Sequence, residues 1–408
     1  MTSRERVVKA INHIEPDRVP VDIGGSFVTG IHMDEYCEIV KNLGLSLLPP
    51  RLMDQFLMVV EADIPVLKWL GSDVVGIENL YHNFGIANKD WHTWTTNRGN
   101  TVLIPGGMQP FKDKDGYTYI RDAKGEVCAR MAPSGDYMDK TVDMTMSEEF
   151  VLADPDKWRK SLPLMTDEEL RLYEKRASFF YNYTDYAVNG SFCSMNLWTF
   201  SPLAGHNFTD WVCLVSLEPE YVESILHATV DWMLENLKMY LEATGKYLET
   251  IVISTADFGS QKCELINPDS FHDLYIPAYK RLNDYVHNTV RAKTFFHSCG
   301  SVRNIIPYMI EAGVDILNPV QTTAGGMDAK ELKTEFGDKI VFWGGGADSQ
   351  NTLPNGTPED VRREVKERLD IFKPGGGYVF TQVHNLQCDV PFENVKAMID
   401  AVKEFGAY

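Results

Sequence analysis

Thr294-Phe295-Phe296-His297-Ser298-Cys299 joins a short apolar run to two side chains that can bind a metal. Similar β-branched or aromatic runs recur along the chain, and a helix-length amphipathic segment follows each of them at some distance. This alternation is typical of a parallel sheet covered by helices. We count eight such runs, at residues 19–22, 73–77, 187–190, 250–254, 294–296, 314–317, 340–343 and 378–381. Eight strand–helix units predict an α/β fold of the closed (β/α)8 TIM-barrel type.

Residues 88–140 interrupt this alternation. Turn signals such as Asn97-Arg98-Gly99 and Asp115-Gly116 separate short runs of alternating polarity there, which predicts a β-meander. We therefore expect a single domain over residues 1–408 with a β-rich insertion at 88–140. Two roles are open for such an insertion: it serves as a lid or partner surface, or it is only a hairpin cover.

Charge and composition argue against several kinds of binding partner and location for this protein. The net charge of -19 disfavours binding to nucleic acid or to anionic lipid, because phosphates would be repelled. No stretch approaches the roughly 18 consecutive apolar residues of a membrane span, and the first residues lack the apolar segment of a signal peptide. The seven cysteines are odd in number and widely spread, which fits a reducing compartment. We expect a cytoplasmic protein that acts on a small molecule or on a protein partner.

Polar side chains follow the predicted strands. In barrels of this type the active site lies where the strands end, so these side chains are candidates for function. They are Asp22, Glu78, Asn189, Asp257, His297, Cys299, Asn318, Gln321, Asp348 and His384. Helix capping and loop solvation remain the alternative for Asp22, Glu78 and Asp348. Trp198 lies among aromatic residues that could either wall an apolar pocket or pack in the core.

The spacing of histidine and cysteine suggests a split zinc site. Zinc prefers imidazole nitrogen and thiolate sulfur, and catalytic zinc sites use three protein ligands and keep one position open. His297 and Cys299 are two residues apart at a strand end, and His384 and Cys388 follow much later in the chain. The alternative is a core histidine beside an inert buried thiol, since free cysteine is among the most buried residue types.

Three segments resemble the uroporphyrinogen decarboxylase superfamily. They are Arg4-Glu5-Arg6-Val7 with Glu15-Pro16-Asp17-Arg18-Val19-Pro20, then Asp257-Phe258-Gly259-Ser260-Gln261, and finally His297-Ser298-Cys299-Gly300-Ser301. The resemblance spans nearly the whole chain and is stronger to the cobalamin-dependent methyltransferase branch. Members of that branch are (β/α)8 barrels that hold zinc through a His-x-Cys pair and a later cysteine. The arginine-rich Arg-Gln-Ala-Gly-Arg stretch of the decarboxylase is replaced here by Val21-Asp22-Ile23-Gly24-Gly25-Ser26.

The resemblance implies roles for individual residues. His297 and Cys299 match the first two metal ligands of the family. The third falls on His384 if Pro391-Phe392-Glu393-Asn394 is set against the family's Pro-Leu-Glu-Asn. Cys388 is the alternative third ligand, or a fourth ligand that substrate displaces. The remaining site residues would be Asp257 and Glu78 as catalytic groups, with Asp22, Asn189, Trp198, Asn318 and Gln321 binding substrate.

The implied activity is a zinc-dependent methyl transfer in one-carbon metabolism. A small methyl donor, such as a methoxylated aromatic in an O-demethylation, would give its methyl group to the cobalt of a corrinoid (cobalamin). A separate corrinoid-binding protein must supply this cofactor, because Leu80 replaces the aspartate of the family's Asp-x-His-x-x-Gly lower-ligand motif. Three alternatives stay open: transfer from methylcorrinoid to a thiol, a metal-free uroporphyrinogen decarboxylase, and a non-catalytic scaffold.

Replacing Cys299 with serine should remove bound zinc and activity together, because the variant lacks the thiolate that is expected to bind the metal. Elemental analysis and a methyl-transfer assay on the same preparation would check this prediction. An active, zinc-free variant would contradict it.

Overall fold

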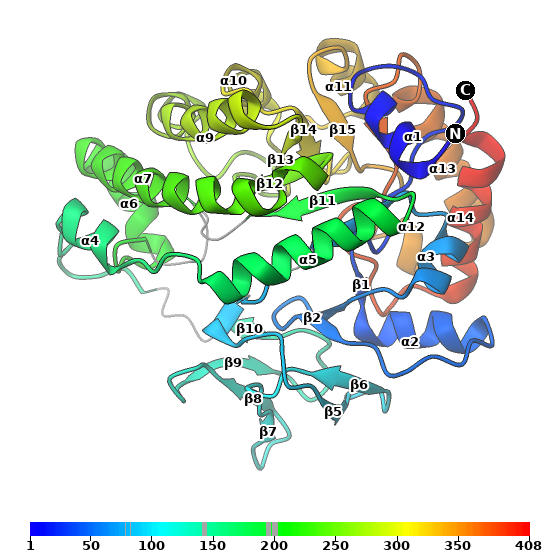
Figure 1. Cartoon of the computed structure of the whole chain (residues 1–408), viewed down its shortest axis with the longest axis horizontal. Coiled ribbons are helices and arrows are strands. Elements are labelled where there is room, and N and C mark those ends of the chain that lie inside the picture. Colours follow the sequence, from blue (N-terminus) through cyan, green and yellow to red (C-terminus); the bar gives the residue numbers. More distant parts are fainter. Residues whose placement is uncertain (78, 82, 141–144, 193–196, 198–202) are drawn as a thin grey trace.

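The computed structural model describes residues 1–408 except 78, 82, 141–144, 193–196 and 198–202 (Figure 1). At its centre is a seven-stranded parallel sheet with the strand order β16-β15-β14-β13-β12-β11-β4. The strands are β4 (Val74–Ile77), β11 (Ala187–Ser191), β12 (Thr250–Ser254), β13 (Lys293–His297), β14 (Ile316–Asn318), β15 (Val341–Trp343) and β16 (Tyr378–Val379). Each coincides with one of the eight runs predicted from the sequence.

The remaining predicted strand, residues 19–22, closes this sheet. It forms one parallel bridge, between Val21 and Phe380. On the side of β16, Phe380 N–H donates to Pro20 (2.8 Å) and Asp22 N–H donates to Phe380 (2.9 Å). On the side of β4, Asp73 N–H donates to the carbonyl of Val21 (2.7 Å). The segment thus joins the two edges of the sheet, and the prediction of a TIM-barrel-like fold is confirmed.

A buried carboxylate fixes this closing segment. Asp73 is 0% exposed, and its Oδ2 accepts from the backbone N–H of Val21 (2.9 Å). Its two oxygens also pair with the guanidinium groups of Arg6 and Arg18, each at 2.7 Å, and Oδ1 accepts from the hydroxyl of Ser3 (2.7 Å). The buried charge is therefore fully paired, as a charge without solvent must be.

Helices surround the barrel (Figure 1). They are α1 (Ser3–Ala10), α2 (Met33–Asn42), α3 (Ile64–Leu70), α4 (Pro155–Ser161), α5 (Asp167–Tyr183), α6 (Phe208–Leu217), α7 (Pro219–Thr244), α8 (Pro268–Ser270), α9 (Ile276–Thr289), α10 (Ile306–Glu311), α11 (Ala329–Phe336), α12 (Thr352–Asn355), α13 (Pro358–Phe372) and α14 (Phe392–Phe405). Thr2 and Glu5 form a capping box that starts α1, and Thr357 with Asp360 does the same for α13. None of the helices in the described residues has both the length and the apolar character needed to cross a membrane.

The barrel interior is apolar, and α1 covers one of its ends. A core cluster contains inward-facing residues of the strands together with residues of α1 and its C-cap: Val7, Ala10, Ile11, Val74, Ala187, Val252, Phe295, Ile316, Val341, Trp343 and Val379. Arg4 N–H donates to Asp185 and Gly377 N–H donates to Ala10, so α1 lies across the ends where β11 and β16 begin. The opposite face, where the strands end, is left for loops.

Antiparallel strands occupy much of residues 88–140. A hairpin of β5 (His92–Thr95) and β6 (Thr101–Ile104) lies beside a sheet of order β10-β9-β8-β7. The latter contains β7 (Phe111–Lys112), β8 (Thr118–Arg121), β9 (Val127–Met131) and β10 (Asp139–Lys140). This segment is drawn in cyan at the bottom of Figure 1, next to β2 (Leu52–Asp54), which pairs with β3 (Val59–Val60) and through it with β1 (Ile31–His32).

Replacing Asp73 with asparagine should lower the free energy of unfolding by about 3 kcal/mol, because two buried or half-buried guanidinium groups lose their shared counter-charge. Urea denaturation would measure the loss. Asp370→Asn is the matched control: it breaks only the exposed pair with Lys366 and should change the free energy by less than about 0.5 kcal/mol. Equal losses in both variants would contradict a special role of Asp73.

Candidate metal centre

His297, Cys299 and His384 come together at the end of the barrel where the strands end. One ligand atom from each lies within 4.8 Å of the others, and within the described residues this is the one group of at least three such side chains found close enough to share an ion. His297 ends β13, Cys299 follows it, and His384 lies in the loop after β16. The sulfur of Cys299 is 3.4 Å from Nε2 of His297, and the two imidazole centroids are 5.3 Å apart.

The orientation of His297 is fixed by Asn318. The amide nitrogen of Asn318 donates to the carbonyl of Trp343 (2.8 Å), so its amide oxygen faces the imidazole. Nδ1 of His297 lies 2.5 Å from that oxygen and therefore carries the proton. Nε2 keeps its lone pair and faces the sulfur of Cys299. This is the arrangement in which proteins hold a metal-binding histidine, with an outer partner setting the tautomer.

Burial sets the protonation of the three side chains. It lowers the pKa of His297 and lowers that of His384 to about 4, so both imidazoles are neutral near pH 7, which is the form that binds metal. Burial raises the pKa of Cys299 well above its usual value, and the nearby Asp257 carboxylate adds to the rise. On binding a dication the thiol would lose its proton to solvent, and the thiolate sulfur would be the ligand.

The donor set fits zinc. A tetrahedral zinc with ordinary bond lengths separates a nitrogen ligand from a sulfur ligand by about 3.6 Å, close to the 3.4 Å between His297 and Cys299. Two imidazoles and one thiol would make three protein ligands for a zinc ion and would leave its fourth position open. That count is typical of catalytic zinc sites and not of structural ones.

Two glycines let the loop carrying Cys299 lie against the loop after β12. Gly300 has φ +82°, and a Cβ placed there would come within 2.5 Å of the carbonyl group of Gly259. A Cβ on Gly259 would in turn meet the carbonyl oxygen of Cys299 at 2.6 Å. Only glycine permits this contact of backbone with backbone. The contact places the loop after β12 directly beside the metal ligands.

Asp257 lies in that loop and reaches the cluster. Its Oδ1 accepts from the backbone N–H of Cys299 (2.8 Å) and lies 3.7 Å from Nε2 of His297. The side chain is 35% exposed, so it faces the solvent side of the cluster. Among the residues predicted as catalytic, Asp257 is thus placed beside the ligands, whereas Glu78 lies outside the described residues.

Gln321 forms hydrogen bonds to three other loops at this end of the barrel. Its Oε1 accepts from the N–H of Gly300 (3.0 Å), and its Nε2 donates to Gln261 (2.9 Å) and Gln350 (3.4 Å). Asn318 and Gln321 were expected to bind substrate, but here their amide groups are engaged with the protein. Gln261 and Gln350 were not predicted as site residues, although each follows a strand on the same face, after β12 and β15.

Other predicted residues lie apart from the cluster. Asp22 is buried and accepts from the indole of Trp343 (2.9 Å), and burial raises its pKa to about 6. Asn189 accepts from the hydroxyl of Thr250 (3.0 Å) inside the barrel. Cys388 does not belong to the cluster of ligand atoms, and its thiol interacts with Asp136. Trp198, expected to bind substrate, lies outside the described residues.

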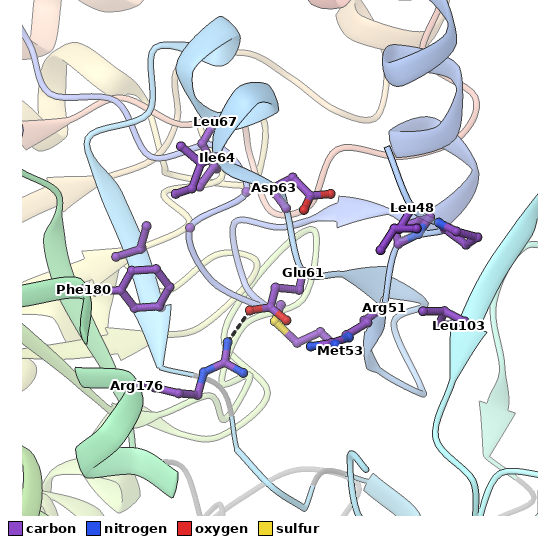
Figure 2. A pocket seen from close by; sticks show the side chains of 17 residues that line it. Leu48, Arg51, Met53, Glu61, Asp63, Ile64, Leu67, Leu103, Arg176 and Phe180 are labelled. Atoms are coloured by element: carbon purple, nitrogen blue, oxygen red, sulfur yellow. Dashed lines mark hydrogen bonds and ion pairs between the residues drawn. The ribbon is translucent and has the colours of Figure 1, made fainter. Parts of the chain in front are cut away.

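A separate hollow of about 340 Å³ lies between α3, α5 and the β2–β3 hairpin. Figure 2 shows Arg176 and Glu61 forming an ion pair in it, with Arg51 and Asp63 nearby. None of the predicted site residues lines this hollow. The candidate site therefore rests on the His–Cys–His cluster.

Replacing Gly300 with alanine should weaken zinc binding at least about tenfold without touching a ligand, because the added Cβ would push the Cys299 loop away from Gly259. Chelator competition would measure the affinity. Gly125→Ala is the control, since Gly125 has a similar φ of +86° but nothing within 4 Å of the added Cβ. Unchanged zinc affinity in Gly300→Ala would contradict the prediction.

Several known proteins match parts of this chain. A uroporphyrinogen decarboxylase of Psychromonas ingrahamii is 37% identical over 80 residues, which is 20% of this chain and 22% of that protein. A methylated-thiol–coenzyme M methyltransferase of Methanosarcina mazei is 23% identical over 211 residues, half of each chain. A methylcobamide:CoM methyltransferase of Methanosarcina acetivorans is 26% identical over 208 residues, 50% of this chain and 55% of that one. The matches thus span between about a fifth and about half of these relatives.

A solved structure, a methyltransferase from Methanosarcina mazei, shares the fold over 99% of both chains, with a TM-score of 0.58 at 17% identity. The family model described as uroporphyrinogen decarboxylase (URO-D) matches residues 192–405, just over half of the 408 residues. That stretch includes the three clustered side chains and Asp257. The resemblance stated from the sequence is confirmed, and the chain belongs to the uroporphyrinogen decarboxylase family.

Proposed function

We propose that this protein is a zinc-dependent methyltransferase that moves a methyl group from a small donor to the cobalt of a corrinoid held by a separate protein. The observation that supports this most is the cluster of His297, Cys299 and His384, which offers three candidate ligands, one fewer than a tetrahedral zinc takes. The family also contains relatives named as methyltransferases of thiols and of methylcobamide. A decarboxylation that needs no metal gives no reason for this cluster.

His297, Cys299 and His384 would hold the zinc. When bound, zinc would stabilise the negative charge that develops on the oxygen or sulfur atom losing its methyl group. Asn318 keeps the proton of His297 on Nδ1 and so keeps Nε2 available as a ligand. Gln321, through the N–H of Gly300, holds the loop of Cys299 in place.

Asp257 is the best-placed group for proton transfer. It is partly exposed on the solvent side of the cluster, and its Oδ1 is anchored by the N–H of Cys299. A carboxyl group so placed can give a proton to the leaving atom of the donor or take one from an incoming thiol. The proposed donor is a small methyl compound, such as a methoxylated aromatic in an O-demethylation.

A second candidate function is the reverse use of the same site, in which methylcorrinoid gives its methyl group to a thiol. Two relatives carry coenzyme M, a thiol, in their names, and this specifically favours a thiol at the open position. Both functions need the same three ligands and the same corrinoid partner. They differ in which molecule occupies the open position.

The test combines metal analysis with methyl transfer to free cob(I)alamin. We expect about one zinc per chain in the native protein, and loss of zinc with at least a hundredfold loss of methylcobalamin formation in His297→Ala and His384→Ala, because each removes one of three ligands. A methoxylated aromatic acid is the first donor to try, and a methyl thioether is the second. Methylation of a thiol by methylcobalamin would instead support the second candidate.

Cys388→Ser is the matched control, because Cys388 is in the same loop as His384 but outside the ligand cluster. It should keep both zinc and activity. A native protein without zinc, or one that forms coproporphyrinogen from uroporphyrinogen, would overturn the proposal in favour of the scaffold or the decarboxylase.

A further inference from the structure

The loop that carries His384 has an unfavourable backbone conformation. His384 has φ +62°, in the left-handed region that residues other than glycine rarely adopt. Such a conformation is unfavourable and persists only where the surrounding structure holds it. The third ligand therefore depends on the groups that anchor its loop, whereas His297 ends a strand of the barrel.

Anchors lie on both sides of His384. Before it, Val383 N–H donates to Ala347 (2.9 Å). After it, the side chain of Asn385 accepts from the N–H of Gly30 (2.8 Å), and the backbone of Leu386 bonds to the segment from Gly30 to His32. The loop is thus fastened to the stretch just after the closing segment of the barrel.

A further anchor comes from the β-rich insertion. Arg98, at the tip of the β5–β6 hairpin, donates from Nη1 to the carbonyl of Cys388 (3.0 Å). Its Nε and Nη2 donate to the two oxygens of Asp136, both at 2.9 Å. The carbonyl of Asp136 lies 2.8 Å from Nε2 of His32, whose backbone N–H donates to Leu386. The insertion therefore contacts the loop of His384 in two ways: directly through Arg98, and indirectly through Asp136 and His32.

The hairpin that carries Arg98 is itself held to the barrel. Thr96 donates from its hydroxyl to Asp34 (2.6 Å), and Asn100 donates from its amide to the same carboxylate oxygen (2.7 Å). Asp34 is 4% exposed and lies in the first turn of α2. The two bonds flank Arg98 in the chain, so its guanidinium group projects from a fixed turn.

We propose that Arg98 is a positioning residue for the third metal ligand, and that the insertion therefore forms part of the metal site. The inference rests on the proposed zinc site, and it adds that the site needs the insertion to hold the loop of His384. Arg98 touches no ligand; it acts by holding the loop of His384 at Cys388. Bidentate pairing with Asp136 needs the planar fork of arginine, which lysine cannot supply.

The experiment measures zinc affinity of the full-length protein by competition with a chromophoric chelator, and the visible spectrum of the cobalt(II)-substituted protein. Arg98→Met should weaken zinc binding about tenfold and change the cobalt bands, because the third ligand is no longer held in place. Arg98→Lys should not restore the native affinity. If Arg98→Met does not fold, Asp136→Asn provides a second variant that loosens the same pair.

Arg121→Met is the matched control. Arg121 lies in the same insertion, donates to the carbonyl of Gly125 (2.9 Å) and lies over the ring of Phe111, and both of these contacts stay within the insertion. It should bind zinc like the native protein. In a His384→Ala background, Arg98→Met should cause no further loss, because the ligand on which it acts is absent.

Native zinc affinity in folded Arg98→Met, an equal loss in Arg121→Met, or a loss that persists without His384 would each overturn the inference and leave the proposed function intact. A native protein that binds no zinc would overturn both. Zinc affinity is measured without any methyl transfer, so a failure of the Arg98 inference can be told apart from a failure of the proposed function.

Discussion

The buried carboxylate of Asp73 is the interaction on which the rest of the structure depends. Seven parallel strands leave two free edges, and the segment at residues 19–22 joins them through only a few backbone bonds. Asp73 strengthens that junction by accepting from Val21 and pairing with Arg6 and Arg18. Closure matters for the site because β16 is separated from β13 by two strands. Only a curled sheet brings the loop of His384 across to His297.

The candidate metal centre combines a rigid part with a loop that other segments hold in place. His297 and Cys299 lie at the end of a core strand, where Asn318 and Gln321 hold the imidazole and the loop through amide hydrogen bonds. His384 lies in a loop with strained backbone and depends on contacts from several segments. A site of this kind can bind metal tightly only when the loop is already ordered. If the loop were mobile, ordering His384 on metal binding would cost conformational entropy and weaken the affinity.

The fold by itself does not choose among the activities of the family. The chain matches decarboxylases over about a fifth of their length and methyltransferases over about half, and one methyltransferase structure has the same fold at 17% identity. Function must be argued from the site. The clustered imidazoles and thiol, with Asp257 beside them, carry the argument for zinc and methyl transfer here. The segment at residues 21–26, which lacks arginine, points the same way.

The sequence by itself determined the barrel and half of the site. Strand periodicity is local, so all eight strand segments were predictable, and His297 and Cys299 are neighbours in the chain. The sequence could not choose between His384 and Cys388, because both lie in a loop without periodicity. The tertiary structure separates the two: His384 lies beside His297, and the thiol of Cys388 interacts with Asp136, so the proposed site uses His384. It likewise engages the amides of Asn318 and Gln321 in hydrogen bonds to the protein. It also gives Arg98, Gln261 and Gln350 hydrogen bonds to distant loops, although none of them was predicted as a site residue. Such hydrogen bonds join segments far apart in the chain, and no local pattern encodes them.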